Sequence, residues 1–309
     1  MKTLVVVTGA TASGKTTTAI ALAEKLGCDI ISADSRQIYR DIPIITAAPS
    51  PDELAAVKHH FIGILPLEAY YSAARFEEDV MALLPELWQQ NDYVVMAGGS
   101  MMYIDAVTHG IDPIPTVSDE IRRMVKGICD NEGLEAVTAM LGQLDPDYLA
   151  RVDRANTRRI VHAVEVSLQA GVPYSTMLTG NRRQRDFRVV KLALDMPREI
   201  LFARINARVE AMEAAGMEAE ARKVFHLRHL NSLNTVGFKE MFSYFDGTMD
   251  RATALARIAK NTRVYAKKQL TWLRRDPDVR WISPSEAASL DAASLTIGRE
   301  DLKQRQYSQ

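Results

Sequence analysis

The sequence predicts an α/β fold in which a parallel sheet is covered by helices on both faces. Short apolar runs alternate with helical segments along much of the chain. A glycine-rich motif of the pattern G-x-x-x-x-G-K-[ST] lies between the first apolar run and the first helical segment. Alternating strands and helices are typical of parallel sheets, and the motif is typical of a phosphate-binding loop that follows a strand. We therefore expect a P-loop parallel sheet.

Four apolar runs supply the predicted strands, at residues 4–7, 30–31, 93–97 and 189–194. The first leads through the glycine-rich loop into a helical stretch that Gly27 ends. The other three lead into the sequences SADS, GGS and DMP. Because the carboxyl ends of parallel strands meet at one edge of a sheet, we expect these loops to line a common ligand crevice.

A helical insertion is predicted between the third and fourth strands. From residue 113 to residue 183 the strand signal vanishes and helical segments follow one another. We therefore divide the chain into a first core segment, 1–112, an inserted helical subdomain, 113–183, and a second core segment, 184–309. Residues 181–188 are predicted to form a polar return into the core.

The second core segment contains one long amphipathic helix, predicted at residues 251–275. Helical spacing places four basic residues on one face and three apolar residues on another. The basic set is Lys260, Arg263, Lys267 and Arg274, and the apolar set is Ile258, Tyr265 and Trp272. The basic face is either a polyanion-binding surface or a solvated helix face.

The composition indicates a globular protein without a membrane anchor. Of the 309 residues, 47% are hydrophobic and 25% are charged, and the formal net charge is −1. No apolar run reaches membrane-spanning length and no leader-like segment begins the chain, so we expect a cytoplasmic protein without membrane contact, and we favour a monomer. Cys28 and Cys129 lie far apart without a C-x-x-C partner, which argues against a disulfide framework or a zinc site.

The glycine-rich loop is expected to bind a phosphorylated ligand. Backbone N–H groups of such a loop cradle phosphate oxygens, its lysine neutralises them, and the following hydroxyl holds Mg²⁺, the expected cofactor. The motif alone is shared with ATP-binding and other nucleotide-binding proteins. The loop residues are Gly9, Ala10, Thr11, Ala12, Ser13, Gly14, Lys15 and Thr16.

Acidic residues near the strand ends separate the candidate functions. Kinases and ATPases place a second metal-binding carboxylate at the end of a nearby strand, but the third strand here ends in Gly98-Gly99-Ser100. Asp195, after the fourth strand, is a rival candidate for that role. Asp34, after the second strand, is expected to face the ligand crevice instead.

Further motifs resemble those of one enzyme family. They are GATASGKT, ISADSRQIYR, HHFIGIL, YSAARF, AGGSMMY, RANTRRIVHAVEV, LNTVGFKEM and YAKKQLTWLRRDP, in that order. Over nearly all of its length the chain resembles the bacterial tRNA dimethylallyltransferases, also called tRNA isopentenyltransferases. The resemblance implies transfer of a dimethylallyl group from dimethylallyl diphosphate to tRNA, with release of diphosphate. The implied acceptor is the exocyclic amine of the adenine 3′-adjacent to the anticodon.

The resemblance also implies roles for individual residues. The loop residues and Arg208 bind the diphosphate, and Thr16 holds the metal. Lys15, Asp34 and Ser100 are the implied catalytic residues; Asp34 accepts the amine proton, and Ser100 stands where the family usually has threonine. The implied tRNA-binding residues are Asp34, Ser35, Arg36, Gln37, Ser100, Arg122, Arg158, Arg159, Ile160, Val161 and His162.

Some positions depart from the family pattern. Ala10 replaces a usual proline, His162 stands where some relatives have arginine, and IITAAPSPDE lacks the glycine and lysine of the usual IGTAKP. Three alternatives remain: a small-molecule or nucleotide kinase that consumes ATP, an adenylate isopentenyltransferase acting on free nucleotides, and a non-catalytic RNA-binding module. The basic insertion and the basic C-terminal helix favour tRNA over a mononucleotide.

Overall fold

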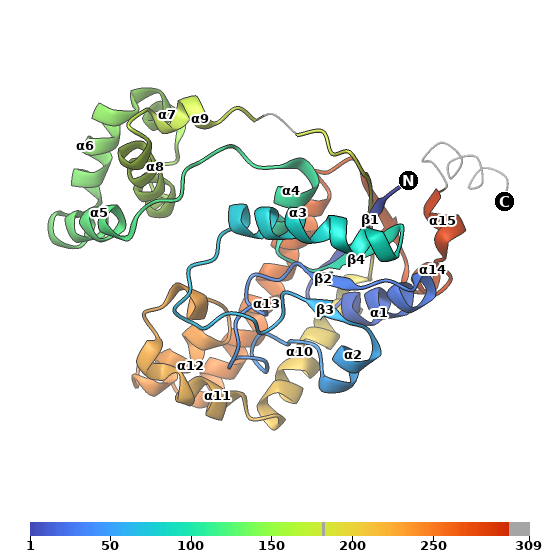
Figure 1. The fold of residues 1–309 in the computed structure, drawn as a ribbon. Coiled ribbons are helices and arrows are strands. Elements are labelled where there is room, and N and C mark those ends of the chain that lie inside the picture. The colour runs from blue at the N-terminus through green and yellow to red at the C-terminus, as the bar shows by residue number, and fades with distance from the viewer. Residues whose placement is uncertain (181–182, 297–309) are drawn as a thin grey trace. The chain divides into compact units, whose positions relative to one another are not determined.

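The computed structural model describes residues 1–180 and 183–296, and within them six parallel strands form one sheet. The strand order is β3-β2-β4-β1-β5-β6. This confirms the predicted α/β fold (Figure 1). The strands are β1 (Thr3–Gly9), β2 (Ile30–Ser32), β3 (His59–His60), β4 (Tyr93–Ala97), β5 (Arg188–Leu194) and β6 (Val279–Ile282).

The register of the central strands brings three loops to one edge of the sheet. β1 is buried along its whole length between β4 and β5. Val7 of β1 and Ser32 of β2 both pair with Ala97 of β4. The glycine-rich loop, the segment carrying Asp34 and the Gly98-Gly99 turn therefore leave the sheet side by side.

Helices cover both faces of this sheet. Val5 and Val7 of β1 lie in a core formed with α1 (Lys15–Leu26), α14 (Pro284–Ala288) and α15 (Ala292–Thr296). Leu4 and Val6, on the opposite side of the strand, pack with α3 (Ala73–Gln90) and α4 (Met101–His109). This alternation follows from the period of two in a strand, and the two helical layers are visible on either side of β1 and β4 in Figure 1.

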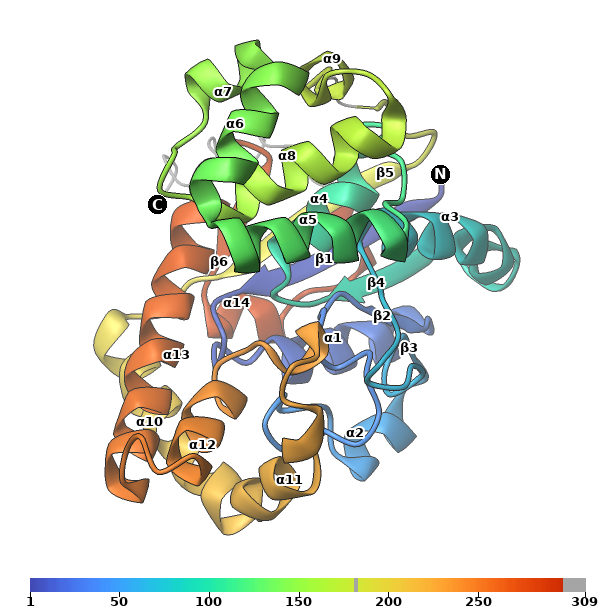
Figure 2. The ribbon, with the colours of Figure 1, turned by 90° about the vertical axis from the view of Figure 1, so that its left-hand side faces the viewer.

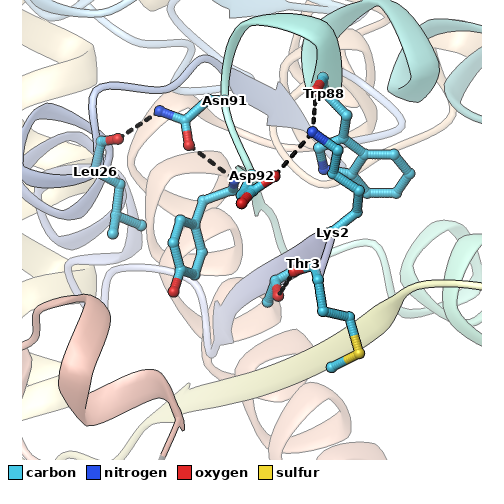
Figure 3. Close-up of polar contacts among 8 residues, drawn as sticks. Lys2, Thr3, Leu26, Trp88, Asn91 and Asp92 are labelled. Carbon is cyan, nitrogen blue, oxygen red and sulfur yellow. Dashed lines mark hydrogen bonds and ion pairs between the residues drawn. The ribbon is translucent and has the colours of Figure 1, made fainter.

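A small group of polar contacts fixes the start of β4 (Figure 3). Asn91 donates from Nδ2 to the Leu26 carbonyl at 2.6 Å, and its Oδ1 accepts from the Tyr93 N–H at 2.9 Å. Lys2 forms an ion pair of 2.9 Å with Asp92 and also donates to the Trp88 carbonyl. The ends of α1 and α3 are thereby joined to the beginnings of β1 and β4.

A second group of helices lies beyond the carboxyl edge of the sheet. Its core contains Phe238, Met241 and Ile258, packed with Ile38 and Ile42 from the segment after β2. Figure 2 shows α13 running beside α10 and α12, as their contacts require. The elements of this group and the neighbouring short helix are α2 (Pro51–Ala56), α10 (Arg198–Ala214), α11 (Met217–Lys223), η1 (Phe225–Leu227), η2 (Asn231–Leu233), α12 (Phe238–Phe245) and α13 (Arg251–Leu273).

The long helix predicted at 251–275 is α13, but its apolar face is not the predicted one. Ile258 is buried, whereas Tyr265 and Trp272 are 39% and 37% exposed. The buried side chains are Ala254, Ile258, Ala266, Gln269 and Leu273. The prediction was wrong for Tyr265 and Trp272 because α13 packs against α10, α12 and β1 through alanines, two aliphatic side chains and one amide, and not through the two large aromatic rings.

The basic face of α13 is partly used for packing. The Arg263 guanidinium and the Lys267 ammonium group lie 6.0 and 5.7 Å from the centroid of the Phe202 ring on α10. Arg263 also donates to Asn206 Oδ1 at 2.6 Å. These two charges therefore help to join α13 to α10, while Lys260 and Arg274 are exposed.

The second compact unit, residues 109–184, is a helical bundle that spans almost the same residues as the predicted insertion, 113–183. The helices that begin at Asp119, Pro146 and Thr157 have side-chain caps, and the core of the bundle contains Val125, Leu141 and Ile160. Asn181 and Arg182, at the start of the predicted polar return, lie outside the described residues. The helices are α5 (Asp119–Glu132), α6 (Leu134–Leu144), α7 (Pro146–Arg151), α8 (Thr157–Ala170) and α9 (Tyr174–Met177). None of the helices in the described ranges combines the length and the hydropathy needed to cross a bilayer.

Candidate active site

The glycine-rich loop between β1 and α1 is shaped by two glycines. Gly9 and Gly14 have φ angles of 145° and 99°, a backbone conformation that residues with a side chain rarely adopt. A Cβ at Gly9 would also lie 3.0 Å from Ser13 Oγ. Helix α1 begins at Lys15, so the N–H groups at its first turn have no intrahelical partner and favour an anion.

Lys15 lies in the positive field of this loop. Its Nζ donates to the Ala10 carbonyl at 2.7 Å. The pKa of Lys15 is lowered to about 8, first by burial and then by the charge of Arg208, while Asp34 acts in the opposite direction. The ammonium group thus stands between a cation and a carboxylate, where an anionic ligand would restore its ordinary pKa.

Two arginines of α10 face the loop, one helical turn apart. Arg208 donates from Nη1 to Thr11 Oγ1 at 3.1 Å and from Nη2 to the Ala47 carbonyl at 3.5 Å. Arg204 Nη1 lies 3.8 Å from the place that a Cβ of Gly14 would occupy. Arg204 is exposed and forms no ion pair with any described residue, so its charge is open to a ligand. Sequence reasoning identified Arg208 and missed Arg204.

Asp34 lies in a tight turn directly after β2. Its Oδ1 accepts hydrogen bonds from the N–H groups of Arg36 and Gln37, at 2.9 and 3.2 Å. Within the described residues, Oδ2 makes no hydrogen bond. The turn therefore fixes the carboxylate by one oxygen and leaves the other for chemistry.

A cavity of about 390 Å³ brings these groups together. Asp34 and Arg208 line it, as do the loop residues Thr11, Ala12, Gly14, Lys15 and Thr16. Residues that sequence reasoning did not assign to the site also line it, among them Ala47, His59, Arg204, Tyr265 and Gln269. One solvent-open cavity thus holds an anion-binding loop at one side and a carboxylate with an unused oxygen at another.

Ser100 contacts the turn that carries Asp34 through Ser35. Its Oγ accepts from the Ser35 N–H at 2.8 Å and donates to Ser35 Oγ at 3.2 Å. The described cavity lining contains Gly98 and Gly99 and not Ser100. Its contacts therefore make Ser100 a support of the Asp34 turn.

Two predicted tRNA-contacting side chains also make internal bonds. Arg36 donates to the carbonyls of Asn231 and Ser232, at 2.7 and 3.1 Å. Gln37 Nε2 donates to the Thr46 and Ala47 carbonyls, at 3.2 and 2.9 Å. Gln37 lines the cavity and Arg36 does not, and the contact of both side chains with tRNA stays a prediction.

The remaining predicted tRNA residues belong to the helical bundle. Arg158 and Arg159 are exposed in the first turn of α8, and Val161 is half-buried. Ile160 is fully buried in the bundle core, so it serves as a packing residue of α8 in this structure.

Arg122 and His162 form a second group in the bundle. Arg122 donates from Nε to the Val117 carbonyl at 3.3 Å, and the His162 ring lies edge-on to Tyr174 with centroids 5.6 Å apart. His162 is exposed, but the contact of its ring with the bundle desolvates it in part, and this, followed by the charge of Arg122, lowers the pKa of His162. The imidazole therefore takes up a proton less readily than a free histidine, unlike the permanently charged arginine that some relatives carry at this position.

Asp195 does not share the cavity with the loop. It is exposed at the end of β5, where its backbone N–H donates to the Ile282 carbonyl at 2.8 Å. It is not among the described residues that line the cavity, while Thr16 and Asp34 are. Of the two candidate metal-binding residues, Thr16 therefore lines the cavity and Asp195 does not.

Comparisons with known proteins decide the family. Residues 37–276 match the model of the IPP transferase family. The chain is 49% identical over 290 residues to tRNA dimethylallyltransferase 2 of Parabacteroides distasonis, covering 94% of this chain and 97% of that protein. It is 51% identical over 282 residues to tRNA dimethylallyltransferase 2 of Porphyromonas gingivalis, covering 91% and 94%. The chain belongs to the tRNA dimethylallyltransferase family.

A solved structure agrees with this assignment. The full-length tRNA isopentenylpyrophosphate transferase of Bacillus halodurans is similar at a TM-score of 0.68 and 30% sequence identity, covering 99% of this chain and 95% of that chain. The match spans nearly the whole length of both. The sheet, the glycine-rich loop and the helical bundle described above are thus parts of one tRNA dimethylallyltransferase-family architecture.

Proposed function

We propose that the protein transfers a dimethylallyl group from dimethylallyl diphosphate to the exocyclic amine of the adenine 3′-adjacent to the anticodon in tRNA. The observation that carries the proposal is the shared cavity, which holds an anion-binding loop and the Asp34 carboxylate at once. Donor diphosphate and acceptor amine need these two groups respectively. Family membership supplies the reaction class.

The loop and its arginines would stabilise the leaving group. As the allylic C–O bond breaks, its electron pair stays on the diphosphate, whose negative charge grows. Lys15, Arg208 and the N-terminus of α1 supply positive charge at that point. Because this attraction strengthens along the reaction, it lowers the barrier and not only the ground state.

Asp34 would orient the acceptor and take its proton. The amine nitrogen forms the new N–C bond to the allylic carbon, and the proton it loses passes to Asp34 Oδ2. Oδ1 stays engaged with the two turn amides, which hold the carboxylate in one orientation. A stacked adenine must leave its stack to reach a cavity at the strand ends, so the base enters flipped out.

Mg²⁺ is the proposed metal, held by Thr16 together with diphosphate oxygens and water. The Thr16 side chain lines the cavity and makes no hydrogen bond within the described part of the chain, which leaves its hydroxyl for an ion. Such a site suits Mg²⁺, which keeps several waters and prefers phosphate oxygens. When bound, the ion neutralises charge on the leaving diphosphate.

The tRNA is proposed to contact both compact units. Arg158, Arg159 and Arg122 are the candidates in the bundle, and the turn at Ser35, Arg36 and Gln37 lies beside the cavity. Arg158 and Arg159 are exposed, and exposed arginines suit phosphate contacts, which give affinity without reading sequence.

Release of diphosphate tests the proposal. The protein should release diphosphate from dimethylallyl diphosphate in the presence of tRNA and Mg²⁺, without ATP. Free adenosine monophosphate should not replace tRNA, which separates this enzyme from one that prenylates free nucleotides. Turnover that requires ATP hydrolysis would favour the kinase alternative.

A further inference from the structure

One amide side chain joins the two halves of the active site. Gln269, on α13, is only 2% exposed although it is polar. Its Oε1 accepts from the Thr11 N–H at 2.8 Å, and its Nε2 donates to the Gly99 carbonyl at 2.9 Å. Both hydrogen-bonding groups of the amide thus engage backbone atoms of different loops.

We propose that Gln269 is a positioning residue that fixes the leaving diphosphate relative to the acceptor base. This inference rests on the proposed prenyl transfer. Thr11 belongs to the diphosphate loop, and its hydroxyl also accepts the hydrogen bond of Arg208. Gly99 precedes Ser100, whose Oγ holds the Ser35 N–H directly after Asp34. A chain of short bonds therefore runs from the phosphate loop through Gln269 to the Asp34 turn.

The residues around the Gln269 amide leave room for it and supply its hydrogen-bond partners. A Cβ at Gly99 would lie 2.4 Å from Gln269 Nε2, so a side chain at position 99 would displace the amide from its present place. The Thr11 N–H, which could otherwise face a phosphate, is used for Gln269 instead. The Thr11 N–H therefore helps to position the loop, whereas the N–H groups at the start of α1 are available to bind the ligand.

The position matters because an allylic cation reacts with any nearby nucleophile. After the C–O bond breaks, the amine must capture the allylic carbon before water does. If water captures it, an O–C bond forms, the water loses a proton, and dimethylallyl alcohol and diphosphate result. Displacement of the loop by about 1 Å is enough to change such rates by about 10²-fold, because capture depends on near-contact geometry.

The partition between these products distinguishes positioning from simple stabilisation. Loss of folded protein lowers prenylated tRNA and dimethylallyl alcohol together, so it leaves their ratio unchanged. Loss of positioning raises the alcohol relative to prenylated tRNA. The ratio therefore reports on the geometry of the active site alone.

Gln269→Leu and Gln269→Glu are the test variants. Leucine removes both hydrogen bonds, whereas glutamate keeps an acceptor for Thr11 and loses the donor to Gly99. Leu273→Ala is the matched control, because Leu273 is buried on the same helix and touches neither loop in the described contacts. Prenylated tRNA, dimethylallyl alcohol and diphosphate are quantified with full-length enzyme, and a thermal melt gives the folded fraction.

The alcohol-to-product ratio should rise by roughly tenfold or more in both Gln269 variants and stay at the wild-type value in Leu273→Ala. A wild-type ratio in a folded Gln269 variant would overturn the positioning role, whatever its total turnover. If Gln269→Leu does not fold, Gln269→Glu alone decides the outcome. A wild-type enzyme that forms no prenylated tRNA would instead overturn the proposed function itself.

Discussion

Ser100 Oγ accepts the backbone N–H of Ser35 at 2.8 Å and so ties the loop after β4 to the turn that carries Asp34. Ser100→Ala removes this acceptor and should lower kcat by about tenfold, because the turn loses one of its supports while the loop that binds the donor is intact. Ser100→Thr keeps the hydroxyl and should retain near-normal kcat. Steady-state kinetics on both variants checks this, and equal activity of Ser100→Ala and wild type would remove Ser100 from the mechanism.

Asp34→Asn should separate chemistry from binding. Asparagine keeps the size and one oxygen but cannot accept a proton at neutral pH, so single-turnover prenyl transfer should fall by roughly 10²-fold or more. Affinity for tRNA, dominated by phosphate contacts elsewhere, should change little. Rates and binding are measured on the same preparation. Transfer at near-normal rate would show that Asp34 is not the base.

Because of Lys15, kcat/KM for dimethylallyl diphosphate should fall at alkaline pH. Burial lowers the pKa of Lys15 to about 8 in the free protein, so the cation is present below pH 8 and is lost as the pH rises through that value. kcat/KM for dimethylallyl diphosphate, which reports groups of the free enzyme, should therefore decline above pH 8 by up to about tenfold per unit. Lys15→Met should show low kcat/KM without this decline. A wild-type profile that stays flat to pH 9.5 would contradict the assignment.

Arg204 should contribute to donor binding. Its guanidinium faces the loop at Gly14, and it forms no ion pair with a described residue that would consume its charge. Arg204→Ala should raise the KM for dimethylallyl diphosphate by roughly tenfold, in keeping with loss of a charged hydrogen bond. Arg198→Ala is the control, because Arg198 lies on the same helix but stacks on Phe202. An equal KM in the two variants would leave Arg204 without a role in the site.

The bundle arginines should control the salt dependence of tRNA binding. Each phosphate contact releases condensed counterions, so replacing Arg158 and Arg159 by glutamine should flatten the slope of log affinity against log salt by up to about one unit per contact. Arg222 and Arg228, which stack on Phe245 and Phe225, offer a control with the same change of charge. An unchanged slope in the Arg158 and Arg159 variant would mean that α8 presents only a solvated face.

The sequence predicted the strands that carry a strong apolar signal. β1, β4 and β5 are long and buried, and their hydrophobic runs stand out from the flanking residues. β3 consists of two histidines and was not predicted, because it forms through pairing with β2 and not through hydrophobic pattern. β6, with the sequence VRWI, was missed for the same reason, since only pairing with β5 distinguishes it from a loop.

Site residues that belong to a sequence motif could be predicted, whereas site residues that are positioned by tertiary packing could not. The glycine-rich loop and Asp34 were identified from patterns and Arg208 from the family resemblance, and the structure brings them into one cavity. Gln269 was missed because its partners, the Thr11 N–H and the Gly99 carbonyl, are backbone atoms 258 and 170 residues away. No local pattern records such contacts. A polar residue on the inner face of an amphipathic helix was the one available signal.

Mass spectrometry of nucleosides tests the central claim most directly. Unmodified tRNA is incubated with the protein, dimethylallyl diphosphate and Mg²⁺ in the absence of ATP, digested, and analysed beside a reaction without donor. The account predicts one new nucleoside, an adenosine heavier by one dimethylallyl group, which fragment mapping places immediately 3′ of the anticodon. Unmodified adenosine at that position after complete incubation, or a dimethylallyl group on a free nucleotide instead, would contradict it.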